Sequence, residues 1–181
     1  MDKFDELEDL LTQHRRTLAQ NTGVPFIRLV YQAEEEYPCQ RLRETLARTL
    51  AQKQVTVKTV SCCGAVFTHY EERGRLEQLF ELEQTGTERL SANIARHARR
   101  ELDRRLASTI EGLKGDGVIF LVDTAFAYPY FQLGPVLDAC TNLITPPMAL
   151  VVFYPGEVDA NGRLMFLGQR LSGYYRTRDL I

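Results

Sequence analysis

The stretch that decides the fold is Met148-Ala149-Leu150-Val151-Val152-Phe153, which is followed at once by Tyr154-Pro155-Gly156. Six consecutive apolar residues predict a strand that is covered on both faces, as in a parallel sheet. Proline presets one turn dihedral and glycine tolerates positive φ, so we expect the strand to stop there. Glu157 and Asp159 then follow the carboxyl end of the strand, the edge where open α/β sheets usually bind ligands and partners.

Three further strands are predicted, over residues 24–31, 55–60 and 118–122, and the last of them is fully apolar and therefore central. Apolar residues at helical spacing predict helices over residues 2–20, 38–53, 72–83, 87–113 and 128–143. The first of these helices is amphipathic, with acidic residues in its first turns, where they suit the helix dipole. Residues 154–181 are expected to form a hairpin centred on Gly162 and a tail.

This order of elements predicts a single three-layer α/β domain over residues 1–181, with a mostly parallel sheet of four or five strands. The net charge of −2 argues against binding of the whole protein to DNA or to an anionic membrane. The four cysteines show no metal-ligand spacing. With no signal-peptide pattern and no apolar run of 18 residues, we expect a chain that stays in a reducing cytoplasm, away from membranes.

The predicted topology is Rossmann-like or like a degenerate P-loop fold, and such folds often hold a nucleotide. The sequence has neither GxxxxGK[ST] nor GxGxxG, and Gln32-Ala33-Glu34-Glu35-Glu36 follows the first strand. Carboxylates there would repel a triphosphate, which needs backbone amides and a lysine. We therefore expect no phosphate-binding loop and no cofactor. Asp123 follows an apolar strand as a Walker B acid would, but an aspartate there is more often a cap.

A second candidate catalytic site is the segment Ser61-Cys62-Cys63, which follows a predicted strand. A cysteine thiol there could act as a nucleophile activated by His69. Small residues that pack at a strand–helix junction are the commoner explanation of such a segment. We therefore do not expect an enzyme. The alternative is a small enzyme or nucleotide-responsive sensor in which three carboxylates hold Mg²⁺ or Mn²⁺; these are Asp123, Glu157 and Asp159.

The long helix over residues 87–113 is rich in arginine, and a basic stripe there could contact DNA phosphates through Arg96, Arg99, Arg100 and Arg104. Acidic residues offset part of this charge, and Glu101 and Arg105 are spaced as an i,i+4 ion pair. Mixed charge of this kind is typical of a solvated helix face. DNA contact is therefore kept as an alternative and direct nucleic-acid binding is not the first expectation.

The carboxyl-terminal segment carries the better functional case, because tyrosine and arginine are the residues that interfaces favour at hot spots. The residues predicted to contact a partner are Tyr128, Tyr130, Tyr154, Glu157, Asp159, Tyr174, Tyr175 and Arg176. An exposed aromatic patch there would mark a protein interface. The alternative is that Tyr154 and one of the paired tyrosines pack on the sheet while Glu157 pairs with Arg176, and the sequence leaves both open.

Three motifs together resemble the BrxB family, the small B component of BREX bacteriophage-exclusion systems. They are Phe153-Tyr154-Pro155-Gly156-Glu157-x-Asp159, Leu164-x-Phe166-x-Gly168 and Tyr174-Tyr175-Arg176. The likeness extends more loosely to the acidic amino-terminal helix, the strand from Pro25 to Tyr31 and Glu71-Glu72-Arg73-Gly74. Where the family pattern usually has an aromatic residue, this chain has Val158.

The resemblance implies phage defence in a bacterial cytoplasm, with the alkaline-phosphatase-like PglZ component and the large ATPase component as partners. Combined with the tyrosine–arginine segment and the absence of a catalytic motif, it predicts a non-catalytic adaptor that docks larger components. Self-association stays open, because the helix over residues 2–20 could pack on its own sheet or on a second copy.

Overall fold

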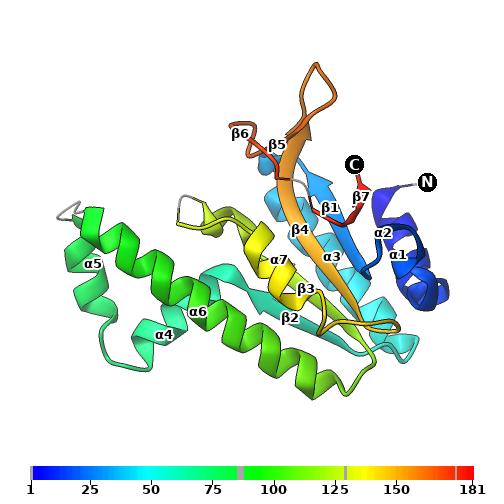
Figure 1. The fold of residues 1–181 in the computed structure, drawn as a ribbon, viewed down its shortest axis with the longest axis horizontal. Coiled ribbons are helices and arrows are strands. Elements are labelled where there is room, and N and C mark those ends of the chain that lie inside the picture. The colour runs from blue at the N-terminus through cyan, green and yellow to red at the C-terminus, as the bar shows by residue number, and fades with distance from the viewer. Residues whose placement is uncertain (1, 85–87, 129, 174) are drawn as a thin grey trace.

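The computed structural model describes residues 2–84, 88–128, 130–173 and 175–181 (Figure 1). Its centre is a parallel sheet in the order β2-β3-β4-β1-β7, which confirms the predicted fold class. The strands of this sheet are β1 Phe26–Tyr31, β2 Val57–Ser61, β3 Val118–Val122, β4 Ala149–Val158 and β7 Arg178–Leu180. Beyond the sheet, β4 continues into an antiparallel extension with β5 Leu164–Phe166, which in turn pairs with β6 Arg170–Leu171.

Helices cover both faces of the sheet and so give the three layers. One face is covered by α1 Lys3–Gln13 and α3 Glu36–Gln52, and the other by α4 Cys62–Glu71, α6 Glu88–Leu113 and α7 Gly134–Cys140. The amino-terminal helix thus packs on its own sheet. The remaining helical elements are η1 Arg15–Thr17, α2 Ala19–Thr22, η2 Ala33–Glu35, α5 Leu76–Gln84 and η3 Thr124–Ala127.

Strand alternation assigns the buried side chains to the two layers of core. On β1, Phe26 and Val30 face α6 and α7, whereas Ile27 and Leu29 face α1 and α3. All six residues of β1 are buried, so every position between these apolar side chains is expected to be apolar too. One position is not, because Arg28 lies between Phe26 and Val30 on the same face.

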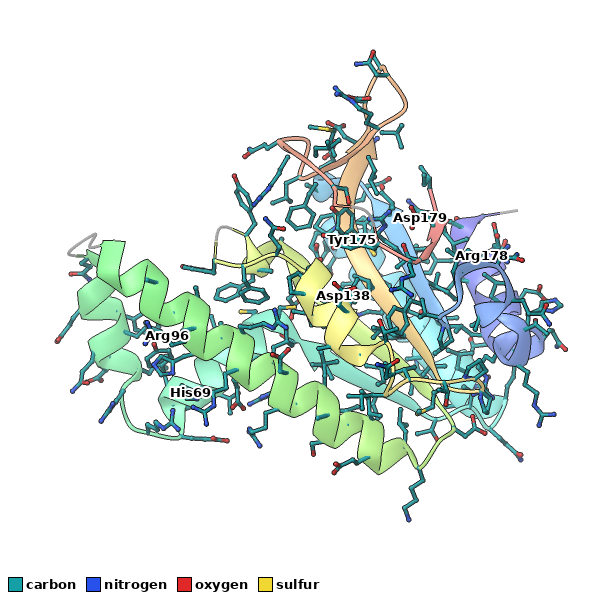
Figure 2. All side chains as sticks on the ribbon, in the orientation of Figure 1. His69, Arg96, Asp138, Tyr175, Arg178 and Asp179 are labelled. Carbon is teal, nitrogen blue, oxygen red and sulfur yellow. The ribbon has the colours of Figure 1, made fainter. Side chains whose placement is uncertain are left out.

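The helices α4 and α5 and the first half of α6 form a projection beyond the β2 edge of the sheet (Figure 1). This helical projection has a small core of its own, made by Val66, Leu79, Ile94 and Ala98. Figure 2 places its labelled residues His69 and Arg96 well away from Tyr175 and Asp179, which lie beside the sheet. The molecule therefore presents two separate regions in which function can be sought.

The structure corrects the predicted end of the fourth strand. Pro155 stays in parallel register opposite Tyr31, and Gly156 pairs with Phe166 of β5. Gly156 is needed for close approach rather than for a turn, because an added Cβ would lie 2.6 Å from the Met165 carbonyl oxygen. The strand therefore passes from parallel to antiparallel pairing without a break.

Several predicted helices also have different bounds. The helix expected over residues 2–20 ends at Gln13, after which Arg15 pairs with Asp116 at 2.5 Å. The helix expected over 128–143 begins only at Gly134, with Pro135 in its first turn. Helix α4 and strand β7 have no counterpart among the sequence-based predictions, and α5 begins four residues later than the helix expected over 72–83.

Candidate functional site at the carboxyl-terminal tail

The carboxyl-terminal tyrosine–arginine segment packs around Arg28, a residue that was not among the predicted site residues. It lies in the middle of β1, and only 5% of its surface is exposed. A buried guanidinium is stabilised only when its charge and its donors are satisfied. Arg28 is flanked in the sequence by Ile27 and Leu29, and its placement among apolar residues is the signal that could have identified it.

The tail supplies the polar partners of Arg28. Its Nε donates to Oδ1 of Asp179 at 2.9 Å, and Nη2 forms an ion pair with the second oxygen of the same carboxylate. Nη1 donates to Oγ of Ser172 at 2.8 Å. A two-pronged guanidinium–carboxylate contact fixes orientation as well as energy. This contact ties β7 and the segment before it to the centre of the sheet.

Two tyrosines enclose the same guanidinium. The Arg28 Cζ atom lies 5.0 Å from the ring centroid of Tyr154 and 5.1 Å from that of Tyr175, which is within the range of cation–π attraction. The Tyr154 hydroxyl donates to Ser172 Oγ at 2.8 Å, and its ring packs on Phe166 with centroids 4.8 Å apart. Burial raises the pKa of Tyr154 to about 12. Figure 2 shows Tyr175 and Asp179 beside the sheet.

Burial changes the interpretation of Tyr154, which was predicted as a partner contact. It is 1% exposed, because β4 continues beyond Phe153 and carries Tyr154 onto the inner face of the sheet. Tyr175 is half-buried against the core. The alternative in which Tyr154 and one of the paired tyrosines pack on the sheet is therefore the observed one. Tyr174 lies outside the described residues.

The exposed surface at this site comes from residues around the two tyrosines. Tyr128 and Leu171 are 37% and 55% exposed, and both line a pocket of about 110 Å³ that Tyr154 and Tyr175 also reach. A wider groove of about 560 Å³ adjoins it and is lined by Leu171, Tyr175 and Arg176. Neither Arg170 nor Arg176 forms an ion pair within the described part of the chain. We call Tyr128, Arg170, Leu171 and Arg176 the tail surface.

The other predicted contacts lie apart from the tail surface. Glu157 is exposed beside Gly168, and no ion pair with Arg176 exists among the described residues, so the predicted Glu157–Arg176 pair is wrong. Asp159 closes the hairpin, because it accepts backbone hydrogen bonds from Arg163 at 2.8 Å and Asn161 at 2.9 Å. These bonds and the Arg163 side chain lower the pKa of Asp159. Tyr130 packs against Phe126, near the projection core.

The structure does not bring Asp123, Glu157 and Asp159 together. Within residues 2–84, 88–128, 130–173 and 175–181, no group of three acidic, histidine or cysteine side chains could hold a metal ion. Asp123 makes no side-chain cap either, since its carboxylate instead accepts a hydrogen bond from Ser61. Its φ of 56° places it in the left-handed region that aspartate tolerates better than most residues.

The segment that follows β2 has a structural explanation. Ser61 caps α4, because its Oγ accepts a hydrogen bond from the Gly64 amide at 2.8 Å. Cys62 is 1% exposed in the core, and burial raises its pKa, as it also does for Cys63. A thiol with a raised pKa is a weak nucleophile.

Two of the four arginines predicted as a DNA-binding stripe on α6, Arg99 and Arg104, are paired within the chain. Arg99 binds Asp103 at 2.9 Å and donates to the Pro135 carbonyl at 2.7 Å, which anchors α7. Arg104 binds Glu101 instead, while Arg96 and Arg100 are exposed. The predicted i,i+4 pair of Glu101 with Arg105 is confirmed at 3.0 Å.

Comparison with known proteins gives one finding. The family model described as "BREX protein BrxB" matches residues 58–180, from β2 to the last residue of β7, and so includes the tail surface. Curated proteins and solved structures give no match. No helix within the described residues is long and apolar enough to span a bilayer.

Proposed function

The chain belongs to the BrxB family and is thereby a component of a BREX anti-phage defence system, in which we propose that it acts as a non-catalytic adaptor. The adaptor docks larger components of the system through the tail surface. The family match runs over most of the chain and reaches the tail, so this surface belongs to the part that identifies the family.

The observation that carries the proposal is the composition of the tail surface. An aromatic and a leucine side chain stand exposed beside two arginines without ion-pair partners in the described chain. Interface hot spots are enriched in tyrosine and arginine, which bury a large area and keep a polar tip. Beneath them, Arg28 holds the tail in one conformation through Asp179 and Ser172. A preorganised surface binds more tightly because less order must be gained on binding.

The family setting supplies the candidate partners, the alkaline-phosphatase-like PglZ component and the large ATPase component. Arg170 and Arg176 on the tail surface favour an acidic patch on the partner, since complementary charge guides encounter and orientation. The leucine and tyrosine favour an apolar centre within that patch.

The test is co-purification of the tagged chain with these two components after co-expression. Leu171→Glu places a charge in the apolar centre of the tail surface and is expected to abolish co-purification. The matched control is Leu143→Glu, because Leu143 is 50% exposed, similar to the 55% of Leu171, and lies after α7. Arg176→Glu is expected to weaken co-purification most at low salt, because salt screens the charge contact that the unchanged chain makes.

Two outcomes would count against the adaptor. If Leu171→Glu and Leu143→Glu retain the partner equally, the tail surface is not the docking site. If neither component co-purifies with the unchanged chain, the adaptor role itself fails. Of the alternatives, the carboxylate-held metal site gains no support from the geometry, because its three residues form no group among the described residues. The DNA-binding stripe is weakened, because Arg99 and Arg104 bind acidic residues of α6 itself.

A further inference from the structure

The helical projection carries an arginine-lined recess that the adaptor proposal does not use. The recess measures about 660 Å³ and lies between α4, the connection that follows it, and α6. Its basic and imidazole side chains come from all three of these segments and are His69, Arg73, Arg75, His97, Arg100 and Arg104. The size is within the range of about 300–1,000 Å³ that is usual for small-ligand sites.

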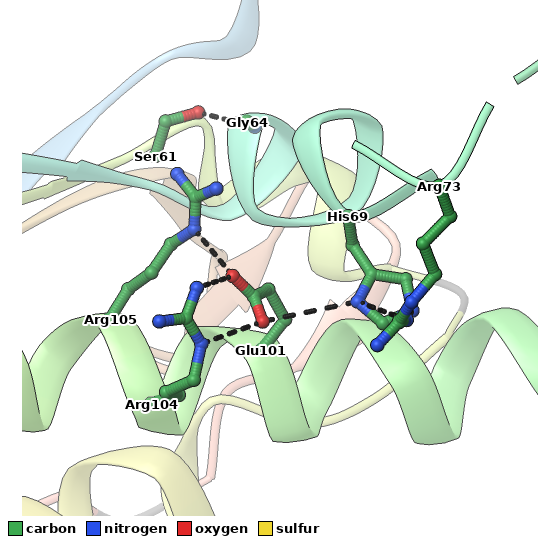
Figure 3. Close-up of polar contacts among 7 residues, drawn as sticks. All are labelled: Ser61, Gly64, His69, Arg73, Glu101, Arg104 and Arg105. Atoms are coloured by element: carbon green, nitrogen blue, oxygen red, sulfur yellow. Dashed lines mark hydrogen bonds and ion pairs between the residues drawn. The ribbon is translucent and has the colours of Figure 1, made fainter. Parts of the chain in front are cut away.

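The positive charge of the recess is poorly compensated. Among the described residues that line it, Glu101 is the one carboxylate, and this group already binds Arg104 at 2.5 Å and Arg105 at 3.0 Å (Figure 3). Arg75 and Arg100 have no ion pair or side-chain hydrogen bond with any part of the chain that the structure describes. Guanidinium groups that converge without acids repel one another, and an anion would relieve that repulsion.

The two histidines of the recess show the same excess of positive charge. Their rings stack with centroids 5.2 Å apart, and Arg73 Nη1 lies 2.9 Å from Nδ1 of His69 (Figure 3). Burial lowers the pKa of His69, and so do the charges of Arg73 and His97, although Glu101 and Glu72 oppose the shift. A neutral imidazole beside a guanidinium can accept its hydrogen bond, which leaves the other donors of Arg73 available to a ligand.

The arrangement favours a compact phosphate ligand over a nucleic-acid backbone. The arginines converge on one recess, whereas Arg99 faces α7. The net charge of −2 also opposes general attraction to DNA. Guanidinium groups match the geometry of phosphate oxygens, and Tyr70 with the two histidines adds aromatic surface to the same recess. We propose that this recess binds the phosphate groups of a small phosphorylated ligand of nucleotide size.

The experiment is isothermal titration of the full chain with pyrophosphate and with ATP, at constant ionic strength. Saturable binding of at least one of them is expected. Arg100→Ala and Arg75→Ala should each weaken it by about tenfold, the usual loss for one charge-assisted hydrogen bond. Both arginines are exposed and have no ion pair among the described residues, so the variants are expected to fold, which circular dichroism checks. Arg41→Ala, an exposed arginine on α3 across the sheet, is the matched control and should bind as the unchanged chain does.

The outcomes separate the ligands. Tighter binding of ATP than of pyrophosphate supports a site that also holds the base, and equal binding supports a site for the phosphates alone. Absence of saturable heat with both ligands overturns the proposal, as does Arg100→Ala binding like Arg41→Ala. A short DNA duplex that binds more tightly than ATP and loses affinity in Arg96→Ala would also overturn it, in favour of a nucleic-acid surface. Co-purification with BREX components does not depend on any of these results.

Discussion

Two arginine-rich regions of this protein use the same side chain in opposite ways. Arg28 is buried and has every partner that a guanidinium needs, namely the carboxylate of Asp179, the hydroxyl of Ser172 and two aromatic faces. Arg100 on the projection is exposed, faces a recess with other arginines and has no partner in the described chain. The first arrangement fixes the fold of the tail. The second leaves guanidinium hydrogen-bond donors without partners in the described chain, and a ligand could accept from them.

The difference shows that arginine and tyrosine content alone does not locate a binding surface. At the tail, most of the tyrosine–arginine interaction is directed inward, so partner binding falls to the residues at its rim, Leu171 and Arg176 among them. On α6, Arg99, Arg104 and Arg105 form ion pairs with Asp103 or Glu101, so only part of the basic helix is available to bind a ligand. Burial and pairing therefore decide which residues of each cluster are free to act.

The largest effect is expected where the satisfied arginine is removed. Arg28→Leu leaves the Asp179 carboxylate without its partner near the sheet and is expected to lower the free energy of unfolding by about 3 kcal/mol. Urea denaturation of the variant and of the unchanged chain measures this difference in the free energy of unfolding. The paired variant Arg28→Leu with Asp179→Leu should recover part of the loss, because it removes the carboxylate that would otherwise stay without its partner beside the sheet. A loss as small as that of a surface variant would show that Arg28 is not structural.

A smaller loss of unfolding free energy is expected when Glu101 is replaced, because this carboxylate neutralises part of the arginine charge of the projection through Arg104 and Arg105. Hydrogen bonds and charge from Arg104 and Arg105 lower the pKa of Glu101 from 4.5 to about 2. Because the folded-state pKa is the lower one, the resulting stability is complete above pH 4.5 and is lost as the pH falls towards 2. Glu101→Gln should therefore cost about 2 kcal/mol near neutral pH, allowing for the solvent exposure of Arg104.

Urea unfolding of both proteins between pH 2 and pH 7 measures this prediction, since the two free energies should converge as the pH approaches the folded-state value of about 2. A difference that stays constant with pH would mean that the carboxylate contributes through packing rather than through charge.

The sequence was sufficient for the central architecture, because its strongest signals are local. The fully apolar run Val118–Val122 is a strand with the predicted bounds, and the helix expected over 87–113 matches the described part of α6. The strand expected over residues 24–31 is also present as β1. Apolar period and length identify such elements without knowledge of their neighbours.

The parts that sequence reasoning missed depend on distant partners. Strand β7 is only three residues long and forms because β1 has a free edge beside it, which no local pattern reveals. Arg28 interrupts an apolar strand, and its role is visible only when Asp179 and Ser172 arrive from 151 and 144 residues away. Similarly, Pro155-Gly156 has the composition of a turn, but pairing with Tyr31 and Phe166 keeps it extended.

Removing a single hydroxyl should have a moderate effect and tests how tightly the Arg28 network is organised. Tyr154→Phe keeps the ring between Arg28 and Phe166 but removes the hydrogen bond to Ser172, which measures 2.8 Å. The expected loss is about 1 kcal/mol, the usual contribution of one such bond. Thermal or urea unfolding gives the value. Ser172→Ala is the companion variant, and a larger loss there is expected because Ser172 also accepts from Arg28.

The smallest effect is expected one position before Asp179. Arg178, labelled next to Asp179 in Figure 2, forms an ion pair with Glu6 of α1. The distance is 2.8 Å, and the Arg178 side chain is 45% exposed. Arg178→Ala should change the free energy of unfolding by no more than about 0.5 kcal/mol, because exposed pairs gain little and are screened by salt. Since Arg178 and Asp179 are adjacent in β7, the pair of variants Arg178→Ala and Asp179→Ala compares an exposed ion pair with one whose arginine, Arg28, is buried. Equal losses would mean that β7 is held by its backbone pairing with β1, and that the buried network around Arg28 does not set the position of the tail.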